Sequence, residues 1–374
     1  MTTVIDITQE QRKARPLGDH MRSAMRVSYA LRHVPESSLH YLLPRPEPPS
    51  VGDIVLARVE SIGKTAALDM NTGRRCAVHM GELIAVVFGN RYATLQFEGY
   101  ARSDGDRCHL LSMGGLCGLV ASRHDAVPEP STLRLEGALG DASGLPLRLR
   151  NFVVSDSATA LGRPRVAVVL GTSMDAGKTY TARSMIRGLR RQGVRVAGIK
   201  LTGTAAGRDT FAMLDAGACT ALDFVDGGLP STYLCSLEDL LTLYRRLVAH
   251  AGAQGAAWVV IEIADGIIQG ETAALLSSTR FTSTVDAWVL AANDALGAAG
   301  AVALLRDRGI APLAISGIVS RSELGRREVE LATKTRCLAA SAIDEGALNA
   351  TLTGAASRPR RTAASGEQPQ VTLG

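Results

Sequence analysis

Residues 171–179 have the composition and spacing of a loop that binds phosphate. The stretch GTSMDAGKT follows the apolar run VAVVL and precedes TARSMIRGL, whose apolar residues recur at helical spacing. A phosphate-binding loop needs glycines in left-handed conformations, N–H groups at a helix N-terminus and a lysine that reaches the outer phosphates. Gly177, Lys178 and Thr179 supply these features in order. We therefore predict a nucleotide site in which Lys178 contacts the β- and γ-phosphates and Thr179 binds Mg²⁺.

The glycines of this loop depart by one residue from the usual spacing. In the pattern G-x-x-x-x-G-K-T the first glycine would stand at Thr172, but the chain carries Gly171 one place earlier. Strand, loop and helix still fall where the motif requires, so we retain the assignment and expect ATP and Mg²⁺ as cofactors. The expected cofactor-binding residues are Gly171, Thr172, Ser173, Met174, Asp175, Ala176, Gly177, Lys178, Thr179 and Tyr180.

Four further charged residues are candidates for the chemistry. Lys200 ends the segment VRVAGIK, from where it would stabilise a transferring phosphoryl group or hold an anionic acceptor. Glu262 follows WVVI, where P-loop enzymes need a second carboxylate for the metal; helix capping or an arginine pair is the alternative. Asp265 stays open between these roles. Asp175, also a catalytic candidate, would activate an acceptor or hold Mg²⁺ through water, with a turn residue as the equal alternative.

The elements around these residues alternate between strand and helix. We expect strands within 166–171, 194–200, 256–266, 285–293 and 311–320, and helices within 181–193, 236–252 and 297–309. This alternation predicts an α/β domain at 163–355 whose parallel sheet has right-handed crossovers. The segment 201–211, which carries Arg208 and Asp209, is either an acceptor-binding loop or a solvated one.

The chain before residue 155 has a different sequence pattern. Short β-like segments separated by turn residues predict a small β-rich, barrel-like domain at 51–155. A basic leader with the proline-rich linker PRPEPPS precedes it at 1–50, and 356–374 is expected to be a disordered tail. Acidic and basic residues balance between 51 and 110, so substrate recognition or a dimer contact is favoured there over RNA binding.

Composition limits the class of protein. The chain has 374 residues, 46% hydrophobic and 21% charged, with a net charge of +5, which indicates a globular protein with no strong bias toward nucleic acid. Its six cysteines form no C-x-x-C pair, which favours a reducing compartment. The sequence shows neither a secretion signal nor an apolar run of the roughly 20 residues that span a bilayer. We expect a cytoplasmic protein without a membrane partner.

The loop GTSMDAGKT resembles G-T-D-T-x-V-G-K-T of dethiobiotin synthetase and its relatives among the P-loop NTPases. The resemblance covers about 170 residues: RQGVRVAGIK resembles the family's second strand with its terminal lysine, here Lys200, and VVIEIADG resembles the family's acidic strand end, here Glu262. Ser173 stands where the family has an aspartate, and Lys200-Leu201 replaces its Lys-Pro pair. The β-rich domain has no counterpart in dethiobiotin synthetase, whereas relatives of a D-glutamate N-acetyltransferase attach a similar P-loop half to another N-terminal domain.

The resemblance implies the same superfamily and nucleotide chemistry with a different acceptor. The expected function is phosphoryl transfer from ATP to a small molecule, as a kinase or as a ligase that activates a carboxylate or carbamate. A nucleotide-dependent switch or chaperone that controls a protein partner is the alternative. The family's dimers imply a homodimer.

Overall fold

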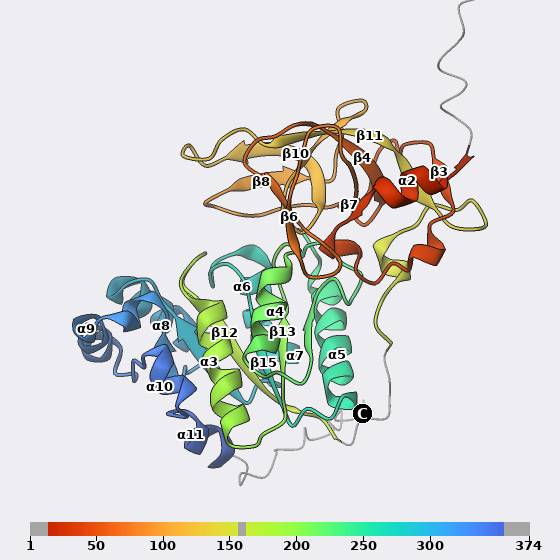
Figure 1. Cartoon of the computed structure of the whole chain (residues 1–374). Helices are drawn as coiled ribbons and strands as arrows, with labels where there is room; N and C mark the ends of the chain where they lie inside the picture. The colour runs from red at the N-terminus through yellow and green to blue at the C-terminus, as the bar shows by residue number, and fades with distance from the viewer. Residues whose placement is uncertain (1–13, 156–161, 355–374) are drawn as a thin grey trace, which may run out of the picture.

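The structure is a computed structural model that describes residues 14–155 and 162–354. These residues form a β-rich unit and an α/β unit, which lie one above the other in Figure 1. This arrangement agrees with the predicted fold class. The predicted tail at 356–374 and the first thirteen residues of the predicted leader lie outside the described residues.

The α/β unit is built on a six-stranded parallel sheet with the order β14-β13-β15-β12-β16-β17. Its strands are β12 Arg165–Gly171, β13 Val196–Lys200, β14 Ala221–Asp223, β15 Trp258–Glu262, β16 Ala287–Ala291 and β17 Ala314–Ser316. Every strand predicted from an apolar run is present, and β14 is an additional one. The runs are apolar throughout because helices cover both faces of a parallel sheet.

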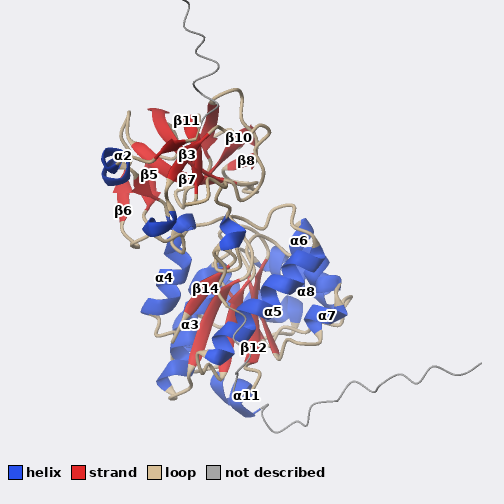
Figure 2. Cartoon of the chain, turned by 90° about the vertical axis from the view of Figure 1, so that its right-hand side faces the viewer, coloured by secondary structure: helices blue, strands red, loops and turns tan. Residues whose placement is uncertain are grey.

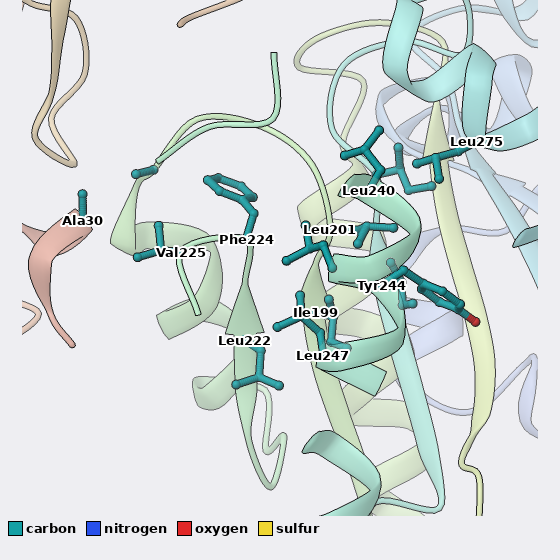
Figure 3. Close-up of a cluster of buried hydrophobic side chains, with 14 of the residues drawn as sticks. Ala30, Ile199, Leu201, Leu222, Phe224, Val225, Leu240, Tyr244, Leu247 and Leu275 are labelled. Atoms are coloured by element: carbon teal, nitrogen blue, oxygen red, sulfur yellow. The ribbon is translucent and has the colours of Figure 1, made fainter. Parts of the chain in front are cut away.

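The helices form one layer on each face of this sheet, as Figure 2 shows. They are α3 Lys178–Arg191, α4 Gly207–Asp215, α5 Leu237–Ala253, α6 Gly270–Ser277, α7 Thr279–Thr282, α8 Ala295–Arg306, α9 Glu323–Thr333, α10 Ala340–Asp344 and α11 Asn349–Gly354. Ala167 and Val169 of β12 pack with α3 and α4, whereas alternate residues of the strand pack with α5, α6 and α8. Figure 3 shows part of the core between the sheet and α5, where Ile199 lies near Leu247 of α5 and Phe224 lies near Leu201.

The β-rich unit contains a closed barrel. Its nine-stranded sheet comprises β1 Arg15–Pro16, β2 Arg26–Val27, β3 Tyr41–Leu43, β4 Ile54–Ser61, β7 Leu83–Phe88, β8 Phe97–Tyr100, β9 Arg107–Leu110, β10 Leu116–Arg123 and β11 Ser131–Gly140. The ring closes because β4, β7, β10, β9 and β11 each pair with the next, and β11 pairs with β4. Val55, Ala57 and Val59 point into the barrel, while Ile54 and Leu56 join a core that extends into the α/β unit. The predicted barrel is thus present.

Residues 15–43, assigned to a leader from the sequence, are part of the β-rich unit. Strand β3 pairs with both β1 and β11, and the one-turn helix η1 (Tyr29–Leu31) is buried, with each of its residues at most 1% exposed. Figure 3 shows Ala30 of this helix on the side of Val225, and both residues belong to the core that is continuous with the α5 face of the sheet. The strands are two or three residues long, so no periodic pattern marked them in the sequence.

A buried polar cluster joins the two units. The Tyr29 hydroxyl donates to Asp223 Oδ2 at 2.7 Å, and Arg32 Nη2 donates to Asp223 at 2.9 Å and Asp226 at 2.6 Å. His33 Nε2 lies 2.6 Å from Asp226 Oδ1. We call these five residues the interface network. Its carboxylates are buried in the α/β unit, and its cationic groups come from the segment around η1, so both units are needed to neutralise it.

None of the helices within 14–155 and 162–354 has the length and apolar character needed to cross a membrane.

Candidate functional site

The phosphate loop connects β12 to α3 with the geometry its sequence predicted. Gly177, at the N-terminus of α3, has φ 92°, and a Cβ there would lie 3.0 Å from Gly317 Cα, so both the conformation and the space require glycine. Gly171 explains the displaced first glycine: a Cβ at this position would lie 2.6 Å from Cδ of Lys178, whose side chain crosses over it. The loop and the parallel sheet behind it form a P-loop NTPase fold.

Lys178 is held inside this loop. Its side chain is buried, and Nζ donates to the carbonyl of Ser173 at 2.7 Å. Burial lowers the pKa of Lys178, and Glu262 and Asp265 partly oppose that shift. A buried ammonium group with a single backbone acceptor is suited to bind a phosphate oxygen.

Four polar side chains, one from each of α3, β13, α4 and β15, meet beside the loop. Thr179 Oγ1 donates to Glu262 Oε1 at 2.9 Å and lies 3.5 Å from Asp209 Oδ1. Lys200 Nζ forms a short ion pair with Asp209 Oδ2. Burial alone would lower the pKa of Lys200, but Asp209 and Glu262 outweigh it and raise the pKa. The predicted residues Thr179, Lys200 and Glu262 therefore come together, and Asp209 joins them.

These residues fit Mg²⁺. Glu262 is 3% exposed, and its Oε2 has no hydrogen-bond partner among the described residues. Burial, followed by the charge of Asp209, raises the pKa of Glu262, so a cation beside it would relieve an unfavourable charge. A threonine hydroxyl and two carboxylates are hard oxygen donors of the kind that Mg²⁺ prefers.

Ser173, which stands where the related loop has an aspartate, has a different partner. Its hydroxyl accepts a hydrogen bond from Asn293 Nδ2 at 2.7 Å and donates to the Met174 carbonyl at 3.1 Å. Asn293 follows β16, so Ser173 ties the loop to the neighbouring strand end. It therefore adds no charge to the metal region.

A cavity of about 540 Å³ opens above the loop, between the two units. Asp175, Lys178 and Asp265 line it from the α/β unit, and Arg91 and Tyr92 line it from the β-rich unit. Asp175 is exposed and has φ 59°, whereas Asp265 is half-buried and has φ 61°. Positive φ at two non-glycine residues of one cavity is strained backbone of the kind that gathers at functional sites.

The β-rich unit also holds the chain segment that carries Asp209. Asp69 Oδ2 accepts a hydrogen bond from the Gly207 N–H at the start of α4 at 3.3 Å, and Ser112 Oγ donates to the Ala205 carbonyl at 3.2 Å. The backbones meet at Gly114, where a Cβ would lie 2.0 Å from the Ala205 oxygen. This close approach accounts for the glycine at position 114.

Sequence reasoning gave no role to two residues of this site. Asp209 was noted in the loop after Lys200, but its approach to Thr179 depends on how α4 docks on the sheet. Arg91 lay in the β-rich segment with no local motif to mark it. Residues 51–110 carry no net charge, so composition did not single out Arg91, which lines the cavity shared with the α/β unit.

No protein-family model matches the chain, and no curated protein matches it either. Among solved structures, the 54 kDa protein of the signal recognition particle from Aeropyrum pernix K1, in complex with GDP, is 18% identical over 55% of this chain and 50% of its own, with a TM-score of 0.36. A DUF1611 family protein from Anabaena variabilis is 13% identical over 55% and 61%, with a TM-score of 0.37. The signal recognition particle receptor FtsY from Elizabethkingia anophelis, in complex with GDP, is 16% identical over 43% and 50%, at 0.30. This chain thus spans about half to three fifths of these neighbours, and the fold assignment rests on the loop and sheet described above.

Proposed function

We propose that the protein is an enzyme that transfers a phosphoryl group from ATP to a small acceptor in the presence of Mg²⁺, as a kinase or as a ligase acting through an activated carboxylate or carbamate. The observation that carries this proposal is the cavity. The phosphate loop faces a half-open cavity lined by both units, which provides room for an acceptor beside the nucleotide. The resemblance of the loop to that of dethiobiotin synthetase supports a transfer reaction.

Each residue of the site has a role in this proposal. The N–H groups of the loop and Lys178 bind the phosphates and stabilise the charge that develops on them. Thr179, Asp209 and Glu262 hold Mg²⁺, which when bound neutralises phosphate oxygens. Lys200, kept protonated by Asp209, stabilises the transferring group. Asp175 remains a candidate for orienting the acceptor, because it is exposed within the cavity.

Nucleotide binding is the first test. Equilibrium binding of fluorescent ATP and GTP analogues to the full chain, with and without Mg²⁺, measures base preference and metal dependence. We expect Lys178→Ala to weaken nucleotide binding and to lower turnover on the order of 100-fold, as for loss of a charge-stabilising donor. Thr179→Ala should abolish the Mg²⁺ dependence. Unchanged affinity and turnover in both variants would refute the proposal.

Identification of the product separates the two functional classes. Incubation with ATP and pools of small acids, amines and alcohols, followed by mass spectrometry, should yield a phosphorylated or ligated product that disappears with Lys178→Ala. Nucleotide hydrolysis that produces no such compound and rises with a protein partner would favour the switch. Sedimentation analysis tests the proposed homodimer.

A further inference from the structure

Arg91 is fixed in the wall of the cavity by contacts on several sides. Its backbone N–H and carbonyl exchange hydrogen bonds with Gly99 at 2.8 and 3.0 Å. Its Nη1 donates to the Leu111 carbonyl, and the guanidinium carbon lies 5.6 Å from the centre of the Phe97 ring. The side chain is therefore already positioned without a ligand.

One edge of this guanidinium has no protein partner in the part of the chain that the structure describes. Nε forms no hydrogen bond but is covered by protein, Nη1 is used by Leu111, and Nη2 has no hydrogen-bond partner among the described residues. Burial lowers the pKa of Arg91 to about 10, and Asp265 opposes the shift, so the group is cationic at neutral pH. A half-buried guanidinium that lines the cavity and has an unpaired Nη2 can bind an anion there, and a carboxylate is one such anion.

Asp265 lines the same cavity as Arg91 and Lys178. Its carboxylate acts on the charge of Arg91 and also on that of Lys178. It has no hydrogen bond among the described residues, unlike Asp209 and Glu262, which contact Thr179. Burial raises the pKa of Asp265, with Lys178 and Lys200 opposing the shift. The cavity is thus lined by a cationic group, Arg91, and by Asp265, a carboxylate without a hydrogen-bond partner among the described residues that is able to accept a proton.

On this basis, and resting on the proposed function, we propose that the acceptor is a small acid that carries a hydroxyl or amino group, with its carboxylate bound to Nη2 of Arg91 and its nucleophile facing Asp265. In the transfer step the nucleophile bonds to the γ-phosphorus as the bond from that phosphorus to the ADP oxygen breaks. ADP leaves with the electron pair, and the proton of the nucleophile passes to Asp265. Tyr92, whose ring centre lies 5.5 Å from that of Tyr233 in the other unit, forms the adjoining wall.

The competing role for Arg91 is direct contact with the γ-phosphate. The acid proposal requires Arg91 to govern acid affinity and leave nucleotide affinity unchanged. The phosphate role requires the reverse. The two roles therefore predict opposite outcomes for the same variant.

The test is calorimetric titration of the full chain, saturated with a non-hydrolysable ATP analogue and Mg²⁺, with glycolate, malate, serine and glutamate. We expect at least one acid to bind, its uncharged amide to fail, and Arg91→Gln to weaken the acid at least 10-fold. Arg91→Lys, which keeps the charge but lacks Nη2, should also weaken it. Arg74→Gln, at an exposed arginine of the same unit, is the matched control and should change nothing.

Asp265→Asn separates binding from chemistry. It should keep acid affinity within about 3-fold and lower kcat at least 100-fold, whereas a structural role would change both. Urea unfolding of each variant verifies that it is folded. Nucleotide binding without acid binding in the wild type, or acid affinity unchanged in Arg91→Gln, would overturn this inference and leave the proposed function standing. Loss of nucleotide binding itself would instead count against the proposed function.

Discussion

Replacing Arg32 by methionine tests whether the interface network holds the two units together. The guanidinium pairs at 2.9 and 2.6 Å with Asp223 and Asp226, whose side chains are 1% and 5% exposed. Removing one partner of a buried ion pair costs about 3–5 kcal/mol, because the remaining charge is unpaired in a medium of low polarity. Tyr29 still donates to Asp223 and His33 still contacts Asp226, so we expect the lower end, about 3 kcal/mol.

Urea unfolding followed by tryptophan fluorescence measures this loss. Both tryptophans, Trp258 and Trp288, lie in the sheet of the α/β unit, so the signal reports whether that unit depends on the interface. With an m-value of about 3 kcal/mol/M, the midpoint should fall by about 1 M. Arg74→Met, at an exposed arginine, is the control and should leave the midpoint unchanged.

Two results would refute this reasoning. A midpoint in Arg32→Met that differs from wild type by less than about 0.2 M would mean that the network contributes little. The double variant Arg32→Met with Asp226→Asn should lose less free energy of unfolding than the sum of the two single losses, because the second change removes one of the unpaired charges. Additive losses would show that the two groups do not interact.

Three further predictions follow from individual contacts. Burial alone would raise the pKa of Asp226, but His33 and Arg32 outweigh it and lower the pKa. The stability that this shift contributes is complete above about pH 4 and is lost as the pH falls toward the lowered pKa. The urea midpoint should therefore decline below pH 4, and it should decline less steeply in Asp226→Asn. Burial raises the pKa of Cys235 to about 12, so its thiol should react slowly with a disulfide reagent at pH 8 in the native protein, and reaction at the rate of a free thiol would contradict its burial. Gly114→Ala should destabilise the protein by about 1–3 kcal/mol, because its Cβ would lie 2.0 Å from the Ala205 oxygen; an unchanged urea midpoint would refute that contact.

Much of the α/β unit was predictable because its signals are local. Each strand is a continuous apolar run, and the loop requires glycine, lysine and threonine at adjacent positions for reasons of backbone conformation and phosphate chemistry. For the barrel, the sequence predicted a series of short strands but not how they pair. Its pairing of β9 with both β10 and β11 joins segments through contacts that no run of residues specifies.

The segment around η1 shows why part of the fold was missed. Tyr29 lies in the one-turn helix η1 and Arg32 directly follows it. The neighbouring strands β2 and β3 are too short to give a periodic pattern, so the sequence there resembles a leader. The burial of these two residues depends on Asp223 and Asp226, nearly 200 positions later. These hydrogen bonds and ion pairs can form only after both units have folded and come into contact.

By itself the sequence determined the phosphate loop, the order of strands and helices, and the candidates Lys178, Thr179, Lys200 and Glu262, because each of these depends on residues adjacent along the chain. The tertiary structure decided which charged groups lie near one another. It brought Asp209 to Thr179 through the docking of α4, and it directed Arg91 of the barrel into the cavity above the loop. Charge interactions act through space over a few ångströms, and that distance is set by folding and not by separation in sequence.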